Sequence, residues 1–277
     1  MTTYRPRARK VSLISSAGVA ALLVSLAWVA AARTPKPSSS TSSSSGDQTL
    51  LTGRGALKQI VQGQCVLNWQ QHNDPAPCER VVLSDPKAAD SGYAILQDPD
   101  GGADYLLVPT KTMAGLDSSE LLDRDAPNYF AEAWHARGLL KTFVGHDVPA
   151  TDVGLVVNTA RARAYDQFHV HIECLRQDAA DALRSISATV TGVWAPVTVS
   201  GATFQAMQIL GDGLDGSNLF ESLAALKPEV SNHMGDYTLV AVGARFAGGP
   251  GFIVLTGTGP SGEFLMDPQC LVAGGGG

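Results

Sequence analysis

Two histidines and a glutamate stand at every second position of one short segment. His169, His171 and Glu173 alternate with the apolar residues Val170 and Ile172. This period of two predicts a β-strand with one buried face, and it places the three polar side chains together on the other face. A neutral imidazole in such a line can attack phosphorus as a nucleophile, and two imidazoles with a carboxylate can hold a metal ion. Two histidines that only face solvent on a half-exposed strand are the alternative interpretation, but two histidines and a glutamate in one line favour a chemical role.

Neighbouring segments predict the sheet in which this strand lies. Strands are expected over residues 92–97 and 103–110, because the Pro- and Gly-containing residues 98–102 between them favour a hairpin turn. A further strand is expected over residues 152–158, followed by the histidine strand over residues 166–175. Only a polar loop separates these last two, so they are expected to pair antiparallel.

Helical spacing of apolar residues and further strand patterns fill the rest of the chain. The expected helices cover residues 57–66, 127–141, 178–190 and 217–226, and the expected strands cover residues 194–207, 237–243 and 251–256. Asp125 is expected to cap the second helix, and His135 lies off its apolar stripe and is expected to face solvent. These elements predict an α+β fold, an antiparallel sheet with flanking helices.

The N-terminal part of the chain differs sharply in composition from the rest. Residues 1–10 are basic, and residues 11–32 contain no charged side chain and are long enough to span a bilayer as a helix. The basic cluster predicts a cytoplasmic N-terminus and a single-pass protein of the cell membrane, with everything that follows on the extracytoplasmic side. A cleaved signal peptide ending at Ala30–Ala32 is the competing interpretation. Residues 33–47, rich in Ser and Pro, are expected to be a flexible linker.

Residues 48–273 are expected to form the catalytic domain, and the four glycines 274–277 a disordered tail. The chain carries 26 acidic against 20 basic residues, and several of the basic ones precede the domain. An acidic domain lacks the basic patch that nucleic-acid binding requires, so we exclude that class of function.

Four cysteines in an exported chain favour disulfide bonds. Of the three possible pairings, we favour Cys65–Cys78, which closes a local Pro-rich loop, together with Cys174–Cys270, which ties the C-terminal part to the back of the histidine strand. Zinc ligation is the alternative, although the chain has no C-x-x-C spacing.

Several motifs resemble those of a known family. They are Cys65 with Asn73–Cys78, Gly92–Tyr93, Tyr105–Thr110, Asp125–Phe130 with Ala133–Trp134, and Asp166–Leu175. Together they resemble the CDP-diacylglycerol pyrophosphatase family from about Leu57 to Leu175, and more loosely as far as Cys270. The histidine segment also resembles the His-x-His-x-His pattern of the histidine-triad superfamily, which has an Asn about a dozen positions upstream. Glu173 here replaces the third histidine.

These resemblances imply hydrolysis of CDP-diacylglycerol to phosphatidate and CMP, with no metal or other cofactor. By alignment with the triad pattern, His171 is expected to be the nucleophile, while His169 contacts phosphate oxygens or holds the local network. A shifted register would make His169 the nucleophile and Gln167 the first triad position. Asn158 is expected to fix an imidazole tautomer or to bind the nucleotide.

The resemblance also implies further substrate contacts and partners. Gln167, Lys111 and Glu173 are expected to contact the substrate, and the basic loop with Arg161 and Arg163 would suit a phosphate. The lipid substrate stays in the bilayer, so the anchor would hold the enzyme close to it. A homodimer, which many histidine-triad proteins form, is compatible with this assignment.

Three alternatives keep the same residues but change the function. His169, His171 and Glu173 could bind the metal ion of a metal-dependent hydrolase, although residues about 7 Å apart along a strand rarely reach one ion. The substrate could be a soluble nucleoside diphosphate derivative rather than a lipid. The domain could also bind nucleotide without catalysis, because a fold does not fix a function.

Overall fold

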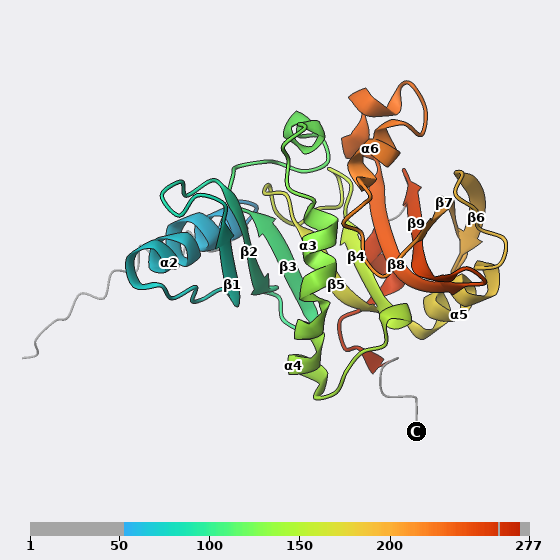
Figure 1. Ribbon diagram of the computed structural model, residues 1–277, viewed down its shortest axis with the longest axis horizontal. Coiled ribbons are helices and arrows are strands. Elements are labelled where there is room, and N and C mark those ends of the chain that lie inside the picture. The colour runs from blue at the N-terminus through green and yellow to red at the C-terminus, as the bar shows by residue number, and fades with distance from the viewer. Residues whose placement is uncertain (1–52, 260, 272–277) are drawn as a thin grey trace, which may run out of the picture. The chain divides into compact units, whose positions relative to one another are not determined.

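The computed structural model describes residues 53–259 and 261–271 (Figure 1). The basic segment 1–10, the expected anchor 11–32, the linker 33–47 and the tail 274–277 lie outside the described residues. Among the residues that are described, no helix is both long and apolar enough to cross a membrane.

One antiparallel sheet forms the frame of the described part. Its strands are β1 (Arg80–Leu83), β2 (Gly92–Gln97), β3 (Asp104–Pro109), β4 (Val153–Val157), β5 (Val170–Leu175), β6 (Ala195–Val199), β7 (Ala202–Leu210), β8 (Thr238–Phe246), β9 (Gly249–Gly257) and β10 (Met266–Asp267). The order is β1-β2-β3-β5-β4-β8-β9-β7-β6, and β10 pairs with β5. The histidine strand β5 therefore lies inside the sheet, between β3 and β4.

Short helices lie against this sheet (Figure 1). They are α1 (Ala56–Ile60), α2 (Val66–His72), α3 (Tyr129–Ala136), α4 (Leu140–Val144), α5 (Gln177–Ile186) and α6 (Leu219–Ala224). A π-helical turn, Val61–Cys65, joins α1 to α2. The combination confirms the α+β class with a large antiparallel sheet.

The sequence-based expectations for the elements are largely confirmed. β2 and β3 form the expected hairpin, and β4 pairs antiparallel with β5. His135 faces solvent on α3, as expected. Asn128, and not Asp125, caps this helix, because the Asn128 side chain accepts a hydrogen bond from the Ala131 amide at 3.1 Å.

Two predicted strands were wrong in detail. The segment 194–207 is a hairpin of β6 and β7, because Ser200 and Gly201 both take positive φ angles and reverse the chain. The histidine strand begins at Val170 and not at residue 166. The Phe168 amide donates to the Met113 carbonyl at 2.6 Å, so the chain joins the ladder only after His169.

The two faces of β5 meet different surroundings. Val170 and Ile172 belong to a large apolar core that includes residues of α3 and α6. On the other face the apolar core is divided: one cluster gathers around α1 and α2 and includes Leu106, and another gathers around α5 and includes Leu175. His171 and Glu173 share this second face and are buried, so the expectation that only one face of the strand is buried was wrong.

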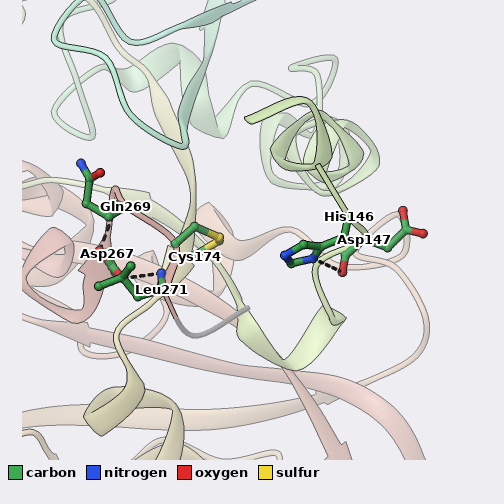
Figure 2. Close-up of a disulfide and its surroundings, with 7 residues drawn as sticks. His146, Asp147, Cys174, Asp267, Gln269 and Leu271 are labelled. Atoms are coloured by element: carbon green, nitrogen blue, oxygen red, sulfur yellow. Dashed lines mark hydrogen bonds between the residues drawn. A yellow bond between two sulfur atoms is a disulfide. The ribbon is translucent and has the colours of Figure 1, made fainter. Parts of the chain in front are cut away.

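Both expected disulfides are confirmed. Cys65 bonds to Cys78 across a separation of 13 residues, and Cys174 bonds to Cys270 across 96 residues (Figure 2). The Cys174 bridge fixes the segment that contains β10, whose Asp267 carboxylate accepts hydrogen bonds from the amides of residues 269 and 271. All cysteines of the chain are thereby oxidised and none ligates zinc.

Candidate active site

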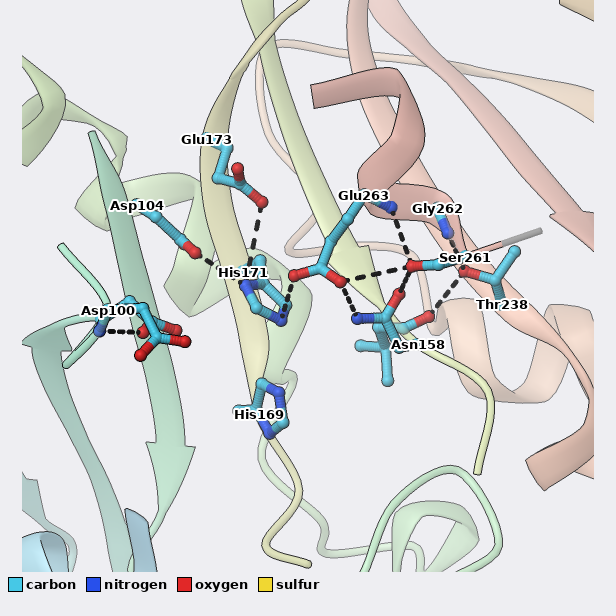
Figure 3. A network of polar contacts seen from close by, with 12 residues as sticks. Asp100, Asp104, Asn158, His169, His171, Glu173, Thr238, Ser261, Gly262 and Glu263 are labelled. Carbon is cyan, nitrogen blue, oxygen red and sulfur yellow. Dashed lines mark hydrogen bonds and ion pairs between the residues drawn. The ribbon is translucent and has the colours of Figure 1, made fainter. Parts of the chain in front are cut away.

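Sheet register brings an acidic residue of β3 beside the histidine strand. Asp104 pairs with Glu173, and Leu106 pairs with His171. Residues paired in this way point to the same face, so the carboxylates of Asp104 and Glu173 and the His171 ring converge (Figure 3). A fourth member, Glu263, comes from the 3₁₀ turn Gly262–Leu265 just before β10.

His171 is surrounded by carboxylates on both edges of its ring. Its Nδ1 lies 3.0 Å from Asp104 Oδ2 and 3.8 Å from Glu173 Oε1, and its Nε2 lies 3.1 Å from Glu263 Oε1. Burial alone lowers the pKa of an imidazole, but the negative charges of these three carboxylates raise the pKa of His171 to about 10. Burial and the Asp104 charge in turn raise the pKa of Glu173 well above its usual range.

His169 has a quite different environment, although its ring centroid lies only 4.8 Å from that of His171. Its Nδ1 lies 2.7 Å from the Gln167 carbonyl oxygen. A carbonyl oxygen can only accept, so Nδ1 carries the proton and Nε2 carries the lone pair. Burial, and then the charge of His171, lower the pKa of His169 to about 3, which keeps the ring neutral. Tyr165 packs edge-on against this ring at 5.7 Å.

Asn158 and Ser261 hold Glu263 in place. The Asn158 side-chain amide donates to Glu263 Oε2 at 2.6 Å, and the Ser261 hydroxyl donates to Asn158 Oδ1. The Ser261 hydroxyl also accepts from the Glu263 amide at 3.2 Å, which caps the 3₁₀ turn. Asn158 therefore contacts Glu263 rather than either histidine ring in this structure (Figure 3).

Of the other expected substrate-binding residues, Glu173 belongs to the carboxylate group, whereas Gln167 and Lys111 lie apart from it. The Gln167 amide donates to the carbonyls of Pro109 and Lys111, at 3.0 and 2.8 Å, and so fixes the loop that carries its own carbonyl. The Lys111 side chain lines a different pocket, together with Arg124.

The two arginines of the basic loop have acidic partners. Arg163 is engaged by Asp117 at 2.6 Å and by Asp166 at 3.5 Å. Arg161 is largely exposed and lies 3.9 Å from Asp236.

A pocket of about 380 Å³ opens onto the carboxylate group. It is lined by Asp98, Asp100, Gly101, Gly102, Asp104, Ala164, His171, Glu173, Glu263, Pro268 and Gln269. Among these described lining residues there is no lysine or arginine. Burial raises the pKa of Asp98, on the pocket wall, to about 6.

Comparison with known proteins decides the family. Residues 52–273 match the sequence model described as CDP-diacylglycerol pyrophosphatase. The chain is also 32% identical, over 213 residues, to a CDP-diacylglycerol pyrophosphatase of Yersinia pestis, and the alignment covers 76% of this chain and 74% of that protein. The chain belongs to the CDP-diacylglycerol pyrophosphatase family. The resemblance noted from the motifs is thereby confirmed at the level of the family.

Sequence reasoning missed Asp104, Glu263 and Ser261 in this family member. A signal existed for Asp104, which is the one charged residue in the strand expected over residues 103–110. Glu263 and Ser261 gave no signal, because a short turn far along the chain brings them to β5.

Proposed function

We propose that this protein hydrolyses CDP-diacylglycerol to phosphatidate and CMP, and that His169 is the nucleophile. The proposal depends on the state of the His169 ring, which is buried and neutral. Its Nδ1 donates a hydrogen bond to the Gln167 carbonyl, so its Nε2 carries a lone pair that can attack phosphorus. Membership of the family, and the name of the Yersinia pestis relative, support the substrate and the reaction.

The reaction proceeds in two displacements. His169 Nε2 attacks the phosphorus on the CMP side, so an N–P bond forms while the bridging P–O bond breaks, and phosphatidate leaves with the electron pair. Water then attacks the same phosphorus, the N–P bond breaks, and CMP is released. The electron pair returns to Nε2 and a proton from the water passes to solvent, which restores the neutral imidazole.

The surroundings of the two rings favour His169 over His171. Both nitrogens of His171 face carboxylate oxygens within 4 Å, so neither presents a lone pair to a substrate. This argues for the register in which Gln167, His169 and His171 are the three triad positions. We extend the proposal to membership of the histidine-triad superfamily.

The neighbouring residues are proposed to position the nucleophile rather than to react. Gln167 fixes the carbonyl that orients His169, and Asn158 orients Glu263 beside His171. Glu173 lies beside His171 Nδ1, on the edge of the ring opposite to the one that Glu263 contacts. Lys111 remains a proposed phosphate contact, which would require its exposed side chain to reach toward the site.

Location and assembly also stay proposals. The segment 11–32 would anchor the enzyme as a single-pass protein, with the domain on the extracytoplasmic side and next to its lipid substrate. Two disulfides in one domain are consistent with an oxidising compartment. A homodimer is compatible with this arrangement.

The test follows CMP release from CDP-diacylglycerol by the full chain in detergent, with acid-free quenching to trap a CMP–histidine adduct. We expect His169→Ala to lower kcat by about 10⁴-fold or more and to abolish the adduct, because the bond-forming atom is gone. The matched control is His72→Gln, which changes an exposed histidine at the end of α2 and should leave kcat and adduct formation unchanged.

A His169→Ala enzyme that still forms the adduct would exclude His169 as the nucleophile. Faster turnover of a soluble cytidine diphosphate ester than of the lipid would exclude the proposed substrate class.

A further inference from the structure

Four potential metal ligands meet in the pocket beside His169. Asp104, His171, Glu173 and Glu263 each offer an atom, and these atoms all lie within 4.8 Å of one another. They come from β3, β5 and the turn before β10, so three separate chain segments must converge to form the group (Figure 3). This set differs from the trio considered from the sequence, because it leaves out His169 and includes two carboxylates of distant segments.

The protein alone leaves this group unsatisfied. Glu173 is only 3% exposed and its Oε1 makes no hydrogen bond, and the same holds for Oδ1 of Asp104, a residue that is 8% exposed. His171 Nε2 also lacks a hydrogen bond of good geometry, although it lies 3.1 Å from Glu263 Oε1. Buried polar atoms in native proteins nearly always have a partner. These three unpartnered atoms all belong to residues of the four-residue group, so a partner that the protein does not supply is expected there.

Charge leads to the same conclusion. One imidazolium can balance at most one of the three carboxylates, and no lysine or arginine stands among the described residues that line the pocket. Buried charges in proteins are normally paired or coordinate metals. A divalent cation would balance the remaining negative charge and would also bind the buried oxygen and nitrogen atoms that have no hydrogen-bond partner.

We propose that Asp104, His171, Glu173 and Glu263 bind a divalent cation of the Mn²⁺ type. Ions with metal–oxygen bonds of roughly 2.0–2.4 Å hold their ligand atoms about 3–5 Å apart, which matches the observed separations. Carboxylates favour hard cations and an imidazole favours transition metals, so a set of three carboxylates and one imidazole suits Mn²⁺ better than Mg²⁺ or Ca²⁺. The pocket of about 380 Å³ provides an entry path and room for coordinated water.

The hydrogen bonds around Glu263 fit a ligand role. Asn158 and Ser261 occupy its Oε2 side, which leaves Oε1 directed toward His171. Partners of this kind orient ligating carboxylates in established metal sites. If the proposed hydrolysis is correct, the cation would also allow an anionic diphosphate to approach a pocket wall that is otherwise acidic.

Binding of Mn²⁺ alone tests the site without reference to activity. The full chain in detergent is stripped with a chelator, dialysed, and titrated with MnCl₂ by calorimetry, with metal content measured after gel filtration. We expect one Mn²⁺ per chain, and at least about a 10-fold weaker affinity in Glu173→Gln and in Glu263→Gln, which each replace a charged ligand. The matched control is Glu229→Gln, because Glu229 is exposed and lies outside the turn that carries Glu263. This variant should bind Mn²⁺ as tightly as the wild type does.

Thermal unfolding keeps the test decisive. Without metal, Glu173→Gln should melt at or above the wild-type temperature, because it removes a buried acidic group whose charged form burial and Asp104 disfavour. Added Mn²⁺ should stabilise the wild type much more than the variant. Should Glu173→Gln fail to fold, Glu263→Gln decides, since its side chain is 37% exposed. The proposal is overturned if the wild type binds no Mn²⁺, or if both glutamine variants bind it as tightly as the wild type. Neither result bears on CMP release, so the proposed hydrolysis stands or falls separately.

Discussion

His169 and His171 stand two residues apart in one segment, yet they lie in opposite electrostatic environments. The first donates to a backbone carbonyl and is neutral, whereas the second lies among three carboxylates and favours the charged form. The surroundings of His169 come from nearby in the sequence, namely Tyr165 and Gln167. Those of His171 come mostly from other segments of the chain. Residue type and spacing therefore identify a reactive segment, while the neighbours that the fold supplies decide what each histidine can do.

The largest effect expected from this contrast concerns stability. Cys174→Ala with Cys270→Ala should lower the free energy of unfolding by about 5 kcal/mol, because the bridge closes a long loop, whereas loss of the 13-residue Cys65–Cys78 bridge should cost about 3 kcal/mol. Urea unfolding measures both. The first change loosens the segment that carries Glu263, so NMR should show a shifted His171 pKa and an unchanged His169 pKa. Equal pKa shifts of His169 and His171 would contradict the proposed difference between their environments.

A smaller effect is expected when the second histidine is replaced. His171→Gln should lower kcat about 10–100-fold and should still form the CMP adduct, because it removes a neighbour of the nucleophile and not the nucleophile itself. Single-turnover assays with CDP-diacylglycerol separate the two outcomes. Loss of the adduct in His171→Gln, with retention in His169→Ala, would reverse the roles that we propose.

The smallest effect is the pH dependence of stability in metal-free protein. The folded-state pKa of His169 is about 3 against an ordinary 6.5, so the unfolded chain binds more protons between these values and stability rises with pH there. The expected slope from this residue is at most about 1.4 kcal/mol per pH unit. His169→Gln should remove that contribution, which urea unfolding at pH 4–6 measures, with His72→Gln as the control.

The raised pKa of His171 acts in the opposite direction. Its stabilising contribution is complete below pH 6.5 and is lost as pH rises toward about 10. NMR at pH 8 should therefore show a protonated His171 ring beside a neutral His169 ring. A neutral His171 at this pH in the metal-free protein would contradict the carboxylate environment described above.

The sequence allowed the frame of the site to be predicted, but not its chemistry. Periodicity and turn residues were sufficient for the β2–β3 hairpin and for the β4–β5 pair. The local Pro-rich span between Cys65 and Cys78 favoured the disulfide pairing that the structure confirms. A period of two shows which side chains share a face of one strand, but it does not show what lies across from them. Asp104 depends on the register between β3 and β5, and Glu263 depends on the path of a distant turn. The start of β5 after His169 depends on a tertiary hydrogen bond to Met113.

The position of β10 also sets the order in which the site can be assembled during synthesis. β10 pairs with the end of β5 on the edge that β3 occupies further along, and the Pro268 carbonyl accepts a hydrogen bond from the Ala103 amide at 2.7 Å. The segment that carries Ser261, Glu263 and β10 leaves the ribosome only after strands β1 to β9 have been made. A nascent chain can therefore form most of its sheet while the pocket still lacks one wall, and the carboxylate group is completed only when this last segment docks.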